Sequence, residues 1–337
     1  MKRSSIGGQG VLEGVMMRSP KYTGIAVRKE SGEMVFSKKE NHPLTEKYKF
    51  FGVPIIRGVV NFVEMLFSGV KTITDSAKMY DDQADEEITP SKMDEFIAKK
   101  TGKDSMDVAM AFSVVLALVI AIGLFFLLPN FLTGLIGENL DHSILKNLID
   151  GLVRLGIFFA YVAIISNLKD IKRLFGYHGA EHKVINCYEH EMPMDVEHAQ
   201  KCSTRHPRCG TSFLLIVMAI SIFCFCFLGW NENPALRMLS RIAMLPVVAG
   251  VSYEVLKLLA KYENGLTRIL RKPGMALQGF TTREPEDGMV EAALMAFFVA
   301  ENEMTSEQIE AKRKEFSHVK EEKKEDADTE TAESESI

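Results

Sequence analysis

Hydrophobic residues are gathered into long runs between residues 108 and 260, while charged residues crowd the chain on either side. A bilayer core of about 30 Å is crossed by roughly 20 apolar residues in a helix, because a helix satisfies its own backbone polar groups. Four segments meet or approach this requirement: residues 108–128, 151–168, 212–230 and 242–260. The pattern predicts a mainly α-helical, polytopic membrane protein with about four transmembrane helices.

The four segments differ in their polar content. The first and third are uncharged, and the third ends at Trp230, a residue suited to the membrane interface. The second carries Arg154 near one end, where a long side chain can reach the headgroups, and the fourth carries Pro246, Glu254 and Lys257. An ionisable group at that depth is a functional candidate, so Glu254 could join a site, although an ion pair with Lys257 explains it equally well.

Lysine and arginine are distributed unevenly between the loops. Residues 169–211 hold seven of them, whereas residues 129–150 hold only Lys146. Because basic loops are retained on the cytosolic side, the 169–211 loop is predicted to be cytosolic, and four spans then place both termini there too.

The region 1–52 has the features of a small cytosolic unit with a β-hairpin. Residues 25–29 and 33–38 alternate between apolar and polar and are separated by a Ser31-Gly32 turn. The preceding Gly7-Gly8-Gln9 triplet predicts a glycine-rich turn.

Residues 53–80 are predicted to form an amphipathic or re-entrant helix. Arg57, Asn61, Glu64 and Ser68 share one helical face, as in a surface helix with an Arg57 to Glu64 contact or a polar stripe within the membrane. Residues 81–105 form an acidic linker, 261–300 a cytosolic C-terminal region, and 301–337 an acidic tail predicted to be disordered.

Composition narrows the choice of partners and compartment. The 337 residues are 47% hydrophobic and 25% charged, with a net charge of −5 and no basic stripe, so the bilayer is the expected partner and nucleic acid is not. Five cysteines without disulfide spacing indicate reduced thiols, and the N-terminus lacks the apolar core of a signal peptide. Homo-oligomer formation stays open.

The 169–211 loop contains five of the eight histidines. His178-Gly-Ala-Glu181-His182 matches the H-x-x-E-H pattern, in which two histidines one helical turn apart share a metal and a glutamate acts as general base. A helix with surface histidines would produce the same letters. The pattern makes His178 and His182 candidate ligands and Glu181 the candidate catalytic residue.

A second cluster, from Cys202 to Thr211, supplies softer ligands. His206 and Cys209 lie directly before the third apolar segment, where a fixed backbone could present them, and thiolate with imidazole suits zinc. Cys202 could also take part, but its polar neighbourhood favours a bystander role. A divalent metal, zinc in the first place, is the predicted cofactor.

Four motifs then suggest a relationship. The runs GGQGVLEGVMMR (7–18), HGAEHK (178–183), HPRCGTSF (206–213) and TTREP (281–285) resemble those of the bacterial YqhQ-like family. The resemblance extends over about residues 6–300 and implies a multi-pass protein of the bacterial cell membrane, in a family described as a domain of unknown function and a metal-dependent membrane enzyme. The resemblance implies that the metal site is formed by His178, Glu181, His182, His206 and Cys209.

Two functional hypotheses follow. In the first, the chain is a metal-dependent membrane enzyme, hydrolase-like, with its site on the cytosolic face. In the second, it is a non-catalytic membrane scaffold or transport-related protein whose histidine loop is structural. Polar residues along the helices would then matter more than Glu181.

Overall fold

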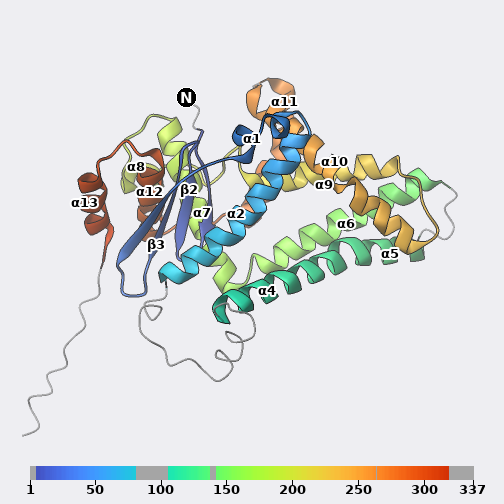
Figure 1. Cartoon of the computed structure of the whole chain (residues 1–337), viewed down its shortest axis with the longest axis horizontal. Coiled ribbons are helices and arrows are strands. Elements are labelled where there is room, and N and C mark those ends of the chain that lie inside the picture. The colour runs from blue at the N-terminus through green and yellow to red at the C-terminus, as the bar shows by residue number, and fades with distance from the viewer. Residues whose placement is uncertain (1–4, 81–104, 137–141, 263, 319–337) are drawn as a thin grey trace, which may run out of the picture.

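The computed structural model describes residues 5–80, 105–136, 142–262 and 264–318, and joins a helical bundle to a smaller α/β unit (Figure 1). The α/β unit contains β1 (Gly7–Val11), β2 (Gly14–Arg18), β3 (Tyr22–Arg28), β4 (Met34–Glu40), α7 (Lys169–Glu189), α8 (Val196–Gln200), α12 (Asp287–Glu301) and α13 (Ser306–Phe316). The bundle contains α2 (Ile56–Tyr80), α4 (Ser105–Ile122), the π-helical η3 (Gly123–Leu127), α5 (Leu128–Ile136), α6 (Ser143–Ile165), α9 (Gly210–Cys226), α10 (Pro234–Lys261) and α11 (Gly265–Thr281). Two short turns, α1 (Leu44–Lys47) and η1 (Lys49–Gly52), precede α2.

The four strands form an antiparallel sheet in the order β1-β2-β3-β4. The predicted hairpin is confirmed as β3 and β4, and Gly32 in their turn has a φ of 90°, which glycine adopts without strain. The predicted glycine-rich turn at Gly7-Gly8-Gln9 is wrong, because these residues form β1 and pair with β2. Glycine weakens the strand signal in the sequence, so neither β1 nor β2 could be recognised.

Both faces of the sheet are covered, so side chains that alternate along each strand belong to two different apolar clusters. Val15, Met17 and Ala26 belong to the core that includes α7 and α12. Met16 and Ile25, on the opposite face, belong to a smaller cluster that reaches the end of α2. The sheet therefore lies between α2 and the pair α7 and α12, which explains why β2 is buried along most of its length.

Helix α12 is the centre of the α/β unit. Its apolar residues are buried around the whole circumference, from Met289 to Ala300, as expected of a core helix rather than a surface helix. At 15 residues it is shorter than a bilayer span requires. Arg28 of β3 pairs with Glu291 of α12 at 2.6 Å and ties the sheet to its first turns.

The predicted tail has a different structure at its start. Residues from 301 were expected to be disordered, yet α13 is a helix whose Ile309 and Phe316 are buried in the same core. Its start is a capping box between Thr305 and Gln308, a sequence signal that the charge-rich composition obscured. Residues 319–337 and the linker residues 81–104 lie outside the described residues.

Within the described residues, three helical stretches are long and apolar enough to cross a membrane: Phe112–Leu135, Ser143–Ile165 and Pro234–Leu259. They correspond to the first, second and fourth predicted spans. The first ends later than predicted, the second and fourth begin earlier, and the second ends at Ile165 rather than at residue 168. The third predicted span corresponds to α9, which has 17 residues and is a shorter apolar helix. The chain is thus mostly helical, with three candidate spans and a small N-terminal sheet.

The segment 169–211 is not the loop that its polarity suggested. Its first half is α7, which follows α6 after a short turn and enters the α/β unit. Most residues from Gly176 to Cys187 are buried, including charged ones, so polarity here marks a buried polar centre rather than a solvated surface.

Glycines allow β1 to lie directly against α7. A Cβ atom at Gly10 would lie 2.8 Å from the Leu174 carbonyl oxygen and 2.9 Å from the His178 nitrogen. At Gly8 it would lie 2.9 Å from Cγ of Glu181. Strand and helix therefore touch through backbone, and no side chain can be added between them without moving α7.

We expect Gly10→Ala to lower the melting temperature of the detergent-purified protein by several degrees, because the new methyl group must displace α7 at a cost of about 1–3 kcal/mol. Gly7→Ala is the matched control, since nothing lies within 4 Å of a Cβ atom at Gly7 in the same strand. Differential scanning fluorimetry measures both. Equal melting temperatures would contradict the close approach of β1 and α7.

Candidate functional site

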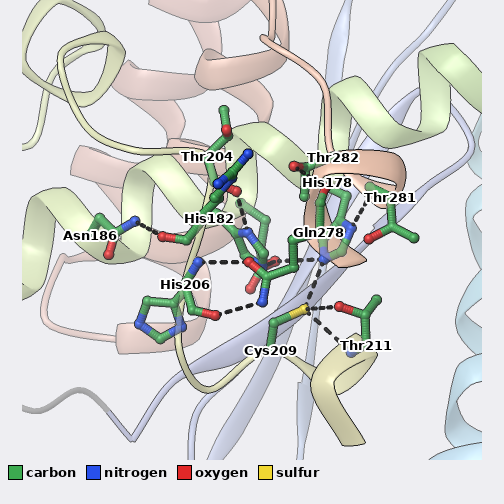
Figure 2. Close-up of polar contacts among 12 residues, drawn as sticks. His178, His182, Asn186, Thr204, His206, Cys209, Thr211, Gln278, Thr281 and Thr282 are labelled. Atoms are coloured by element: carbon green, nitrogen blue, oxygen red, sulfur yellow. Dashed lines mark hydrogen bonds and ion pairs between the residues drawn. The ribbon is translucent and has the colours of Figure 1, made fainter. Parts of the chain in front are cut away.

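Three side chains with metal-binding atoms converge where α7 meets the start of α9. His178 and His182 lie one turn apart on α7, and Cys209 is the N-cap residue of α9. One ligand atom from each lies within 4.8 Å of the other two. The His178 Nε2 atom is 3.3 Å from the Cys209 sulfur, and Figure 2 shows the contact.

Backbone carbonyl groups orient both imidazoles. The Nδ1 atom of His178 lies 2.8 Å from the Thr281 carbonyl oxygen, and Nδ1 of His182 lies 2.6 Å from that of Thr204 (Figure 2). A carbonyl oxygen can only accept, so each Nδ1 carries the proton and donates it. In the neutral ring, each Nε2 then keeps a free lone pair, the form that binds metal.

Two buried polar atoms at this place have no hydrogen-bond partner within the described part of the chain: Nε2 of His182 and Oε2 of Glu181. The Glu181 Oε2 atom lies 3.5 Å from Nε2 of His182 and 3.8 Å from Nε2 of His178. Buried polar groups without partners are rare and cost free energy, so these two atoms mark a place in the core that the described donors and acceptors leave unsatisfied.

Burial controls the protonation of these groups. It raises the pKa of Glu181, although His178, His206 and a backbone hydrogen bond from Gly8 oppose the rise. It lowers the pKa of His182, and the nearby Cys209 offsets part of that change. The His182 imidazole is thereby kept neutral near neutral pH, which leaves Nε2 available to a metal.

The donor set and its spacing fit zinc. Two imidazole nitrogens and one thiolate are typical zinc ligands, and a tetrahedral zinc site separates its ligand atoms by about 3.5 Å. The 3.3 Å between His178 Nε2 and the Cys209 sulfur agrees with that separation. With three protein ligands, a fourth position would remain for water or substrate.

His206 was also expected to be a ligand, and the structure places its imidazole elsewhere. Its Nε2 atom is 3.3 Å from the Glu189 carboxylate, which also pairs with Arg208. In Figure 2 the ring points away from Cys209. The group of three therefore excludes His206, whose buried hydrogen bond to Glu189 instead fastens the turn before α9 to the end of α7.

The two residues left open by the sequence lie outside the group of three. Cys202 has its sulfur 3.5 Å from the His198 carbonyl oxygen. Glu254 of α10 pairs with Arg57 of α2, with Arg57 Nε 2.7 Å from Oε1, instead of the expected Lys257. The predicted Arg57 to Glu64 contact is therefore wrong as well, because the partner of Arg57 comes from another helix.

Several positioning residues could not be found from the sequence. Lys183 donates to the carbonyl groups of Gln200 and Cys202, and Asn186 donates to those of Ser203 and Arg205. Gln278 of α11 binds both the N–H and the C=O of His206. These bonds hold residues 200–206 in the place where the Thr204 carbonyl meets His182.

We expect Asn186→Leu to loosen residues 201–206, because a side chain of similar size keeps the packing but removes both donors. Hydrogen-deuterium exchange should show faster exchange in peptides covering this segment, with the rest of α7 unchanged. Lys201→Gln is the control, since the Lys201 ammonium group pairs with the exposed Glu197 and donates to none of the carbonyl groups named above. Unchanged exchange in Asn186→Leu would show that these bonds do not hold the segment.

Comparison with known proteins places the chain in a family. A family model described as "Protein of unknown function (DUF1385)" matches residues 53–303. The chain is also 36% identical to "Uncharacterized protein YqhQ" of Bacillus subtilis (strain 168) over 296 residues, which cover 86% of this chain and 90% of that protein. The chain belongs to the DUF1385 family. It is YqhQ-like over most of its length, and no solved structure matches it.

The DUF1385 match includes every candidate ligand and also α12, the core helix of the α/β unit. It leaves out the strands β1 to β4, which lie before residue 53. The sheet that packs against the His178 and His182 helix is thus contributed by residues outside the matched range.

Proposed function

We propose that this DUF1385 protein is a metal-dependent membrane enzyme of the hydrolase type. The observation that carries the proposal is the convergence of His178 Nε2, His182 Nε2 and the Cys209 sulfur within 4.8 Å. Beside them lies a buried carboxyl group whose Oε2 atom has no hydrogen-bond partner among the described residues. Zinc is the metal that this donor set favours.

Zinc held in this way supplies Lewis acidity, polarising a carbonyl or phosphoryl oxygen and lowering the pKa of water. Glu181 is the residue proposed to accept the proton. Its Oε2 atom faces both Nε2 atoms, and burial raises its pKa above that of an exposed carboxyl group, which makes it the stronger base. The carbonyls of Thr204 and Thr281 hold the imidazoles in orientation.

We place the protein in the bacterial cell membrane with four spans and both termini in the cytosol. Helix α9, with 17 residues, has a length of about 26 Å and is followed by apolar residues and Trp230, which supports a fourth span. The lysine and arginine content of residues 169–211 supports a cytosolic site.

A groove beside the site indicates which class of substrate would fit the proposed enzyme. It has a volume of about 570 Å³, lies between α9, α10 and α11, and is lined mainly by apolar side chains. Arg208 and Ser212, which flank Cys209 in the sequence, also line it. The groove favours a substrate with an apolar portion that approaches from the bilayer.

We expect detergent-purified protein, prepared without chelator, to contain about one zinc or similar ion per chain. Cys209→Ser and the double variant His178→Ala/His182→Ala should lose most of it, because each removes ligand atoms from the group of three. Plasma mass spectrometry measures the ratio.

His206→Ala is the matched control and should retain the metal, because its imidazole binds Glu189 instead. Loss of metal from His206→Ala alone, in a variant that still folds, would contradict the ligand set. Absence of metal from the wild type, even after reconstitution with zinc, would overturn the enzyme proposal.

Glu181→Gln tests the catalytic role. We expect the variant to bind cobalt with the same visible spectrum as the wild type, because Glu181 is not among the three ligands. Hydrolysis in a screen of ester, amide and phosphodiester substrates should fall by about 100-fold or more, as for loss of a general base. An active Glu181→Gln enzyme would leave Glu181 without the proposed role.

A second candidate function is a non-catalytic scaffold or transport-related protein. It is favoured by the buried charges within the bundle, where Asp150 pairs with Arg154 at 2.7 Å and with Arg241 at 3.0 Å. Ionisable groups inside candidate spans often mark ion or substrate pathways. In that case Glu181→Gln would change little, whereas Asp150→Asn would abolish function.

A further inference from the structure

A second polar site lies at the end of the bundle opposite the three candidate metal ligands. Cys209 begins α9, whereas Trp230 follows the other end of that helix and precedes α10. Around Trp230 lie the end of α5, the start of α6 and the first turns of α10, which line a cavity of about 610 Å³.

Arg237 is a buried cation at this cavity whose partners are neutral. Its Nε donates to the Asn130 side chain at 2.7 Å and its Nη1 to the Asn231 carbonyl at 2.8 Å, while its guanidinium lies 3.9 Å from the centre of the Trp230 ring. Its exposed fraction is 6%. Among the described residues, no carboxylate lies within ion-pair distance of Arg237.

The nearest buried carboxylate is already engaged. Asp150 accepts from Arg154 and Arg241, so three arginines in this part of the bundle share one buried acid. A buried cation without a counter-ion is costly in a low-dielectric environment. Among the described residues, the cluster therefore carries a positive charge that no carboxylate neutralises.

Thr133 provides an independent indication that this cavity accommodates a polar ligand. It lines the same cavity, it is fully buried, and its hydroxyl has no hydrogen-bond partner in the part of the chain that the structure describes. Lys146 also lines the cavity. Among the described residues, Glu232 is the carboxylate that lines the cavity; its side chain is 83% exposed and lies 3.6 Å from the Lys146 ammonium group.

We propose that this cavity binds a phosphate group, with the Arg237 guanidinium, the Thr133 hydroxyl and the Lys146 ammonium group as donors. Arginine binds phosphate with a planar fork of N–H groups, and charge-assisted hydrogen bonds are among the strongest in proteins. A tetrahedral oxyanion can accept from donors that approach from several directions. The phosphate belongs to a lipid headgroup or to a free anion.

The test uses the full-length protein, purified in a phosphate-free detergent. One arm titrates inorganic phosphate by isothermal titration calorimetry, and the other measures retention of phosphatidylglycerol by native mass spectrometry after incubation with phosphatidylglycerol vesicles. Binding in the first arm identifies a free-anion site, and binding in the second arm alone identifies a lipid headgroup site. Binding in neither arm overturns the proposal.

Variants connect the binding to these residues. Arg237→Gln should weaken binding by about tenfold or more, from the loss of a cation with its hydrogen bonds to phosphate. Thr133→Val should weaken it by about fivefold, from the loss of one hydroxyl donor. Thr133→Val is expected to keep its melting temperature without ligand, since its hydroxyl has no partner to lose. This variant keeps the proposal testable if Arg237→Gln does not fold.

Arg268→Gln is the control, because this exposed arginine lies on α11, near the metal-ligand end of the bundle. Its affinity should equal that of the wild type, and zinc content should be unchanged in all three variants, so the outcome is independent of the proposed enzyme. Unweakened binding in Thr133→Val and in any folded Arg237→Gln would overturn the proposal.

Discussion

The contact of α7 with backbone on several sides is the constraint on which the rest of the structure depends. Gly8 and Gly10 bring β1 against one side of the helix, and the Arg283 carbonyl comes too close to Gly179 for any Cβ atom there. Lys183 and Asn186 hold a loop on another side. A helix fixed in this way cannot rotate or slide, so its two histidines keep a single orientation.

The polar interior around α7 has a cost that the apolar core must offset. Glu181, His182 and Lys183 are consecutive buried residues, in a position where an ordinary helix would bury leucine or alanine. Lys183 is satisfied by carbonyl groups, whereas Glu181 and His182 each keep one buried atom without a partner in the described residues. Proteins that leave buried polar atoms without hydrogen-bond partners do so most often at binding or catalytic sites.

The sequence predicted the elements whose signals are local. The apolar runs predicted the long helices, and the Ser31-Gly32 turn predicted the β3 and β4 hairpin. H-x-x-E-H placed His178, Glu181 and His182 on one helix, as the structure has them. The predictions that failed concerned contacts between distant segments. The glycines of β1 gave no strand signal. His206 binds Glu189 and Glu254 binds Arg57, and no sequence spacing indicates either pair.

The positions of the three candidate ligands also bear on how the two units are joined. Helix α7 continues from α6, Cys209 begins α9, and the carbonyl that orients His178 comes from the last residue of α11. A metal held by His178, His182 and Cys209 would therefore fasten bundle helices to the α/β unit. Such a metal would stabilise the fold as well as supply chemistry, because binding to the folded state alone adds to its stability. Metal retention by itself is thus expected of a structural site too. Under the proposed function, the two roles differ at the buried Glu181 carboxyl group, because an enzyme would need this base and a purely structural site would not.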